Sequence, residues 1–245
     1  MEMIISILAA AVRSGTPILF ATLGEIITEK SGILNLGLEG IMLIGALTGF
    51  SITLSSGNPW LGIMGAFFMG AFLTLIHGFI SITLKGNQVV SGLAMTIFGT
   101  GVSSLMGKAF IGKTIPGLLK TPFPVLNRIP ILGQIFFNHD PLVYCSFFLI
   151  IFLTWFFIST RIGLNLRAVG DSPRAADAMG LNVNRIRYLA VFIGGGIIAL
   201  GGAYLSVAYN KMWAESMTAG RGWIAVALVI FAIWNPTRAA LGAYL

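Results

Sequence analysis

The side chains best suited to chemistry lie in one short stretch, GEIITEKSGILNLGLEG, at positions 24–40. It holds three carboxylates, an ammonium group and an amide, contributed by Glu25, Glu29, Glu39, Lys30 and Asn35. Glu25 and Glu29 are one helical turn apart, and so are Asn35 and Glu39. Groups with this spacing can bind a proton or cation, line a polar pathway, or hydrogen-bond a neighbouring helix. Gly32, Gly37 and Gly40 leave room for a bend in the backbone.

The chain around this stretch is strongly apolar. Of its 245 residues, 56% are hydrophobic and only 9% are charged, whereas a soluble domain carries about 25% charged residues. So much apolar surface cannot be hidden from water in a fold of this length, so the chain is an integral membrane protein in contact with lipid. The net charge is +7, but the bases lie mainly between apolar stretches, which is typical of membrane-flanking residues and not of nucleic-acid binding.

Apolar stretches of about 20 residues mark helices that cross the hydrocarbon. We predict spans near 14–28, 33–56, 60–84, 89–107, 141–159 and 188–208, a seventh that begins at Trp223, and the start of an eighth at 239–245. The expected fold is all-α: a polytopic transmembrane helix bundle of about seven or eight spans in one membrane-embedded domain, 1–245. Since the last apolar stretch is cut short, we expect further sequence at the C-terminal end.

A carboxylate inside the membrane needs a partner. An ionised side chain at mid-bilayer costs about 2.5–3.5 kcal/mol, and a Leu or Ile returns only about 0.3–0.6 kcal/mol. Glu39 should therefore face protein, a polar cavity or an interface. Two interpretations remain open: the Asn35–Glu39 face lines or braces a translocation path, or Glu39 makes a buried structural hydrogen bond to a neighbouring helix backbone.

A few polar residues at the start of the fourth predicted span are further candidates. Asn87 and Gln88 can contact a polar solute, although a helix cap is an equally good interpretation for Asn87. Thr96 and Thr100 belong to a stripe of small residues at four-residue spacing, which either faces a pathway or packs against another helix. We group Asn35, Glu39, Asn87, Gln88, Thr96 and Thr100 as candidate path residues. The sequence contains no cluster of metal ligands.

The segment 171–180, DSPRAADAMG, has the signals of a short, well-delimited helix. Asp171 and Ser172 suit the N-cap, Pro173 suits the first helical position, and Gly180 suits a left-handed C-cap. The residues between them complete the segment: Arg174, Ala175, Ala176, Asp177, Ala178 and Met179. A helix this short is marginal in water, so we expect it to be buried by its own domain or by a partner protein.

This segment lies in the most polar connection, 160–187, and a proline-containing loop occupies 108–140. Lys and Arg divide almost evenly between the two sides of the predicted membrane, so charge fixes the orientation only weakly. The density of Arg in 160–187 favours a cytoplasmic position for that loop, which places 108–140 and Arg221 on the opposite side.

The motifs GEIITEKSGILNLGLEGIMLIGA (24–46), NQVVSGLAM (87–95), LRAVGDSPRAADAMGLNVNRIRYLA (166–190) and GRGWIAVALVIFAIWNP (220–236) resemble permease subunits of bacterial ABC importers. The resemblance is to the branched-chain amino acid/ribose permease superfamily, in its nucleoside and simple-sugar branch. It implies that 171–180 is the coupling helix, docked on a cytoplasmic ABC ATPase subunit that binds ATP and Mg²⁺. It also implies a second permease subunit, identical or related, an extracytoplasmic substrate-binding lipoprotein, and a multi-pass position among the lipids of the bacterial inner membrane.

The same resemblance implies that this chain binds no cofactor and is not itself an enzyme, and the sequence contains no G-x-x-x-x-G-K-[ST] phosphate loop. The function we expect is ATP-driven translocation of a nucleoside or simple sugar. The alternative is an ion-coupled secondary transporter that uses Glu39 within the membrane.

Overall fold

A computed structural model describes residues 2–122, 129 and 131–245 of the chain. Within these ranges the regular structure is helical, with one isolated bridge between Thr114 and Met212. The proline-containing loop is confirmed in part: 111–122 holds no helix and 132–136 forms a short one, while Pro124 and Pro130 lie outside the described residues.

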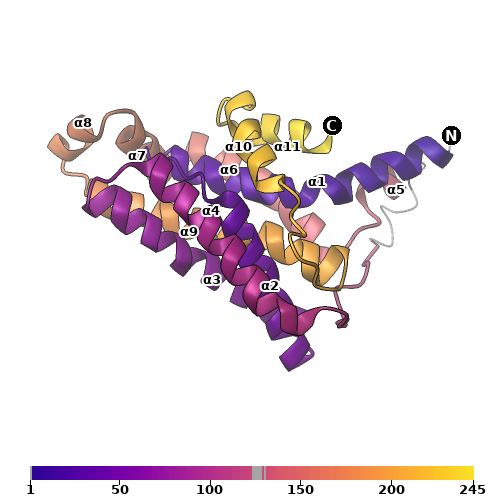
Figure 1. Ribbon diagram of the computed structural model, residues 1–245. Helices are drawn as coiled ribbons and strands as arrows, with labels where there is room; N and C mark the ends of the chain where they lie inside the picture. The colour runs from indigo at the N-terminus through magenta and orange to yellow at the C-terminus, as the bar shows by residue number, and fades with distance from the viewer. Residues whose placement is uncertain (1, 123–128, 130) are drawn as a thin grey trace.

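The elements follow one another as shown in Figure 1. The helices are α1 (Glu2–Glu29), α2 (Leu38–Ser56), α3 (Pro59–Gly78), α4 (Gln88–Gly107), α5 (Leu132–Phe136), α6 (Pro141–Ser159), α7 (Arg161–Asp171), α8 (Pro173–Ala178), α9 (Val183–Ala203), α10 (Arg221–Phe231) and α11 (Pro236–Tyr244). Helices α3 and α9 continue into π-helical turns, Phe79–Thr83 and Tyr204–Tyr209, and α4 continues into a 3-10 turn, Lys108–Phe110.

Among the described residues, six helices are long and apolar enough to cross a membrane: α1, α2, α3, α4, α6 and α9 with their extensions. The predicted count of seven or eight spans is too high for these residues. The seventh apolar stretch folds as the 11-residue helix α10, which at 1.5 Å per residue is about 16 Å long, or half of a bilayer core. It stops because Asn235 and Pro236 start a new helix, with Asn235 Oδ1 accepting from the N–H groups of Thr237 and Arg238.

Helix α9 lies at the centre of the bundle and contacts α1, α2 and α3. Its small residues let these neighbours approach closely, as the spacing of Gly195, Ala199 and Ala203 predicts. A Cβ built on Gly195 would lie 2.0 Å from Thr74 Oγ1, and one built on Gly202 would lie 1.8 Å from the carbonyl oxygen of Met42. The core is therefore held by backbone-to-backbone contact between helices.

This packing predicts unequal effects for two glycines in helices. We expect Gly202→Ala to destabilise the bundle by several degrees in a thermal-unfolding assay in detergent, because α2 and α9 must separate to admit the methyl group. Gly101 is the matched control: it lies in α4, and a Cβ there meets nothing within 4 Å. Gly101→Ala should be neutral or slightly stabilising, since Ala is favoured over Gly in helices by about 1 kcal/mol. Equal effects of the two substitutions would contradict the close α2–α9 packing.

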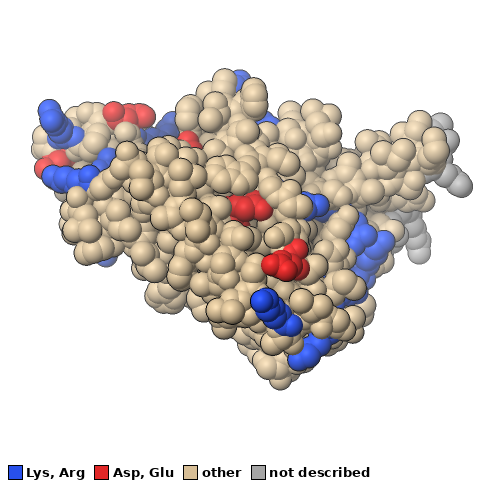
Figure 2. Space-filling view, viewed as in Figure 1, with Lys and Arg blue, Asp and Glu red and all other residues tan. Residues whose placement is uncertain are grey.

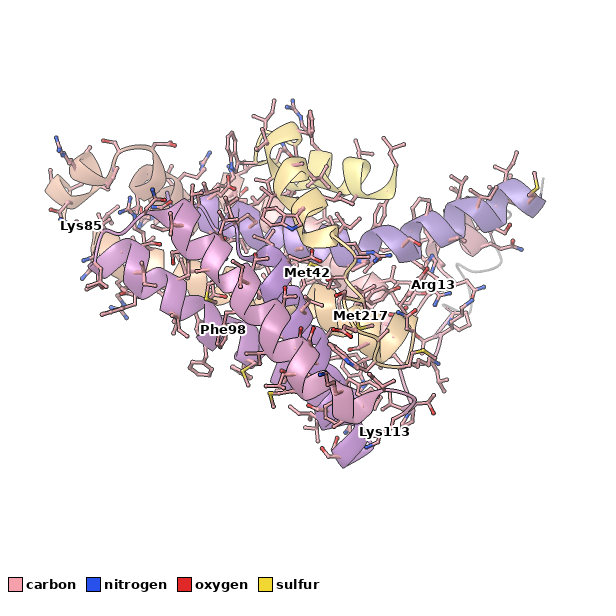
Figure 3. The ribbon with its side chains drawn as sticks, in the orientation of Figure 1. Arg13, Met42, Lys85, Phe98, Lys113 and Met217 are labelled. Carbon is pink, nitrogen blue, oxygen red and sulfur yellow. The ribbon has the colours of Figure 1, made fainter. Side chains whose placement is uncertain are left out.

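Charged side chains gather mainly at the two ends of the molecule, and the face between them is largely neutral apart from small acidic patches (Figure 2). Helix α8 projects from one end, where Lys85 also lies, while Arg13 and Lys113 lie toward the other end (Figures 1 and 3). Met42 and Met217 lie between the ends. This separation is what a membrane-spanning bundle requires, because the apolar belt must match the hydrocarbon.

Candidate functional site

The chain between α1 and α2 is not helical, although the second span was predicted to begin near residue 33. A turn occupies 30–32, where Gly32 has φ +85°, and 33–37 has no regular secondary structure. Backbone N–H and C=O groups that lie inside a membrane protein and outside a helix must find hydrogen-bond partners other than water. Four side chains from α1, α3 and α4 provide them. At Leu34, Gln88 Oε1 accepts from the N–H (2.8 Å) and His77 Nε2 lies 3.1 Å from the carbonyl oxygen. Glu25 Oε1 accepts from the N–H of Asn35 (2.8 Å), and Thr96 Oγ1 donates to the carbonyl oxygen of Leu36 (2.9 Å).

Three of the predicted path residues thus lie together: Asn35 is in the segment 33–37, and Gln88 and Thr96 bind its backbone. Most of their polar atoms are engaged with the chain itself. Asn35 Oδ1 accepts from the N–H of Gly37 (2.8 Å), whereas its Nδ2 is buried and has no hydrogen-bond partner among the described residues.

The other two path residues at the fourth span have local roles. Asn87 caps α4, its Oδ1 accepting from the N–H groups of Val89 and Val90 at 2.9 and 3.2 Å, as the capping interpretation predicted. Thr100 Oγ1 donates to Thr96 O within the same helix at 2.8 Å. Neither contact points to solute binding.

The C-terminal end of the segment lies near the middle of α4. A Cβ built on Gly40 would lie 2.4 Å from Met95 O, and one built on Gly99 would lie 2.5 Å from Gly40 Cα. Met95 and Gly99 are the eighth and twelfth of the 20 residues of α4, counting from Gln88. Since α4 is about 30 Å long, the start of α2 lies near the midpoint of that helix.

Glu39, beside Gly40, binds the beginning of α10. Its Oε1 accepts from Thr218 Oγ1 (2.5 Å) and from the N–H of Gly220 (2.9 Å), and its Oε2 accepts from the N–H of Gly222 (2.7 Å). A carboxylate is favourable here because the first N–H groups of a helix lack partners and carry partial positive charge. The hydrogen bond of Glu39 to a neighbouring helix backbone is present, and a role of Asn35 and Glu39 in a translocation path stays a prediction.

Two helix breaks therefore meet beside the middle of α4: 30–37 before α2, and 210–220 before α10. We call the contact of Glu39 with Thr218, Gly220 and Gly222 the midpoint junction. Sequence reasoning missed Thr218, Gly220 and Gly222, which lie beside Arg221 at the start of α10. Gly220 takes the N-cap position of α10 with φ +82°, a left-handed conformation that glycine adopts readily. Discontinuous helices near the midplane are how many transporters form their substrate sites.

The second candidate site is the segment 171–180. Ser172 occupies the N-cap, as predicted, but its side chain makes no cap hydrogen bond. Helix α8 is six residues long, and Gly180 follows it with φ +82°. Ala176 is buried, while Arg174, Ala175, Asp177, Ala178 and Met179 are exposed, Met179 to 83%. A concavity of about 630 Å³ beside the helix is lined by residues of α8 and of the start of α9. The helix thus presents most of its surface outward.

The start of the segment 30–37 lies at the same end of the molecule as α8. Lys30 is next to Arg167 and Asp171 of α7. Burial lowers the pKa of the Lys30 ammonium below its ordinary value, nearby Arg167 lowers it further, and Asp171 opposes the shift. The Lys30 Nζ also lies 5.1 Å from the centre of the Phe157 ring, a position that partly replaces lost hydration.

Comparison with known proteins agrees with this arrangement. A family model described as a permease component of the branched-chain amino acid transport system matches residues 7–245. A solved ABC transporter of the metal-chelate type, in an inward-facing conformation, aligns with 97% of this chain and 73% of its own, with a TM-score of 0.53 and 13% sequence identity, which shows a shared fold.

Three relatives are more similar in sequence. A Haloferax volcanii protein named as a glucose ABC transporter permease, TsgC13, is 45% identical over 98% of this chain and 74% of its own. The guanosine permease protein NupQ of Bacillus subtilis is 37% identical over 98% and 78%, and the nucleoside permease protein NupC of Lactococcus lactis is 33% identical over 94% and 76%. The chain therefore belongs to the branched-chain amino acid transport system permease family, as a multi-pass membrane subunit of an ABC transporter whose ATPase is a separate subunit.

Proposed function

We propose that this chain is the permease subunit of an ABC importer for a nucleoside or a simple sugar. The observation that carries the proposal is the set of relatives named for guanosine, nucleoside and glucose transport, at 33–45% identity over nearly the whole chain. In this assignment ATP and Mg²⁺ bind to the partner ATPase. A second permease subunit completes the pathway, and a substrate-binding lipoprotein delivers the solute at the end of the molecule opposite α8.

Residues 171–180 are proposed to be the coupling helix that contacts the ATPase. Their outward exposure at one end of the bundle supports this role, since a marginal two-turn helix gains stability when a partner covers it. Arg174, which is exposed on α8, can pair with acidic groups of that partner. This assignment makes the α8 end cytoplasmic.

The translocation path is proposed to pass the midpoint junction, where Glu39, Asn35 and the start of α10 come together. Non-helical backbone at membrane depth is tolerated only where it is buried in protein or lines a polar cavity. The three donors on Glu39 leave little of its carboxylate free for a transported ion, so the ion-coupled alternative has no support from this geometry. Membership in an ABC permease family favours ATP as the energy source.

The solute is tested by uptake into proteoliposomes that contain the permease, its ATPase and its binding protein. We expect guanosine or glucose to be imported in an ATP-dependent manner and to be displaced by unlabelled members of the same solute class. Leucine serves as the control, because the family description names branched-chain amino acids. Import of leucine in preference to every nucleoside and sugar tested would refute the substrate assignment. Uptake that persists without ATP would refute the energy source.

A further inference from the structure

We propose that the segment Lys30–Gly37 transmits movement of the α7–α8–α9 loop to the midpoint junction, and that Arg187 is the positioning residue that attaches the segment to that loop. This inference rests on the proposed function, since it assumes that α8 is moved by an ATPase. It adds a specific mechanical route between two sites that are far apart on the molecule.

The loop holds the lower part of the segment from two sides. Arg187, in the first turns of α9, donates from Nε to the carbonyl oxygen of Ser31 at 3.1 Å. On the other side Gly170, near the end of α7, lies so close that a Cβ built on it would be 2.3 Å from the carbonyl oxygen of Lys30. Gly170 precedes α8 and Arg187 follows it, so the two ends of the proposed coupling loop lie on either side of the turn at Lys30 and Ser31. Displacement of the loop must displace Lys30 and Ser31.

The upper part of the segment cannot absorb such a displacement by sliding. Leu34, Asn35 and Leu36 are tied through their backbone groups to side chains of α1, α3 and α4. The bond between Glu25 and Asn35 is buried and the other three are partly buried. A buried group left without its hydrogen bond costs roughly 1–3 kcal/mol. The segment from Lys30 to Gly37 is only eight residues long, so displacement of its start also displaces Glu39, two residues beyond its end, whose carboxylate binds α10.

A second contact links α10 to the residue that precedes the segment. The indole N–H of Trp234, just beyond α10, donates to the Glu29 carboxylate at the end of α1. Ile233 and Trp234 both have positive φ, +51° and +50°, which is a costly conformation for residues with a side chain. Helix α10 is thus held at one end by Glu39 and near its other end by Glu29, on either side of the segment. A cavity of about 400 Å³ lined by Glu29, Lys30, Arg167, Asp171 and Trp234 leaves space beside α7 for movement.

The test compares substitutions at Arg187 with a matched control on the same helix, Arg185, whose side chain is exposed. The complete complex of permease, ATPase and binding protein is reconstituted in proteoliposomes, and solute uptake and ATP hydrolysis are measured in the same vesicles. For Arg187→Ala we expect uptake per ATP hydrolysed to fall at least tenfold while the ATPase rate stays within twofold of wild type. Arg187→Lys, which can still donate to Ser31 O, should recover uptake to within about threefold, and Arg185→Ala should match wild type.

The outcomes separate this inference from the function on which it rests. A wild-type complex that imports none of the solutes contradicts the proposed function. Wild-type import combined with an Arg187→Ala variant that loses uptake and ATP hydrolysis in proportion, or loses neither, contradicts the transmission route. Failure of Arg187→Lys to recover uptake while the complex assembles normally also contradicts it. A folding defect is recognised separately, by loss of assembled complex on size-exclusion chromatography.

Discussion

Replacing Ala178 with Arg is expected to abolish solute uptake and co-purification of the ATPase, while membrane insertion of the permease stays normal. Ala178 is the last residue of α8 and its side chain is exposed, so an arginine there can extend into solvent without disturbing the chain. If an ATPase covers this surface, the guanidinium of an arginine at position 178 must lose its water within a tightly packed contact. The loss of binding should then exceed 2 kcal/mol, as for a central interface residue.

The controls use the burial pattern of the same helix. Ala178→Ser adds one small polar atom to the same place and should retain ATPase binding. Ala176 is a poor site for this test, because it is only 4% exposed and Ala176→Asp would disrupt the loop itself. Pull-down of the ATPase from detergent-solubilised membranes measures the effect. Normal ATPase binding by Ala178→Arg would overturn the assignment of 171–180 as the coupling helix.

Substituting Glu39 with Gln is expected to reduce uptake by about tenfold. The amide oxygen of Gln can still accept from Thr218 and Gly220, but its NH₂ group would face the N–H of Gly222, so two donors would oppose each other. An unsatisfied donor in such a place costs roughly 1–3 kcal/mol, and 1.4 kcal/mol corresponds to a factor of ten. Glu39→Ala, which removes all three acceptor contacts, should have the larger effect.

Glu215 provides the comparison for Glu39. It lies in the same connection, 210–220, but its side chain is exposed, and Glu215→Gln removes the same charge. Uptake should be close to wild type for this variant. The thermal midpoint is measured in parallel, since a loss of 1 kcal/mol lowers it by about 2–4 °C in a chain of this size. If Glu39→Gln lowers the midpoint and leaves uptake and ATP hydrolysis intact, the junction is structural and takes no part in translocation.

Features of the chain that depend on local sequence were predictable. The apolar stretch 141–159 was predicted as a span and is helix α6 over the same residues, because the hydrocarbon thickness sets helix length directly. The short helix at 173–178 also followed from its own residues, with Pro173 at the first position and Gly180 beyond its end. The stripe Gly195, Ala199 and Ala203 indicated close helix packing, and α9 is the central helix. In each case the information lies within a few residues along the chain.

The sequence by itself thus determined that this is a helical membrane protein with a projecting two-turn helix, and the tertiary structure decided how its polar residues are used. No local pattern shows that Glu39 binds the start of a helix some 180 residues later, or that the apolar stretch at Trp223 folds as a helix of only 11 residues. The break at 30–37 is of the same kind. Its residues are apolar enough for a helix, and the irregular backbone is stabilised by Glu25, His77, Gln88 and Thr96, which supply hydrogen bonds that a helix would otherwise make internally. Such compensation arises from side chains distant in sequence, so it becomes visible only when the helices are assembled.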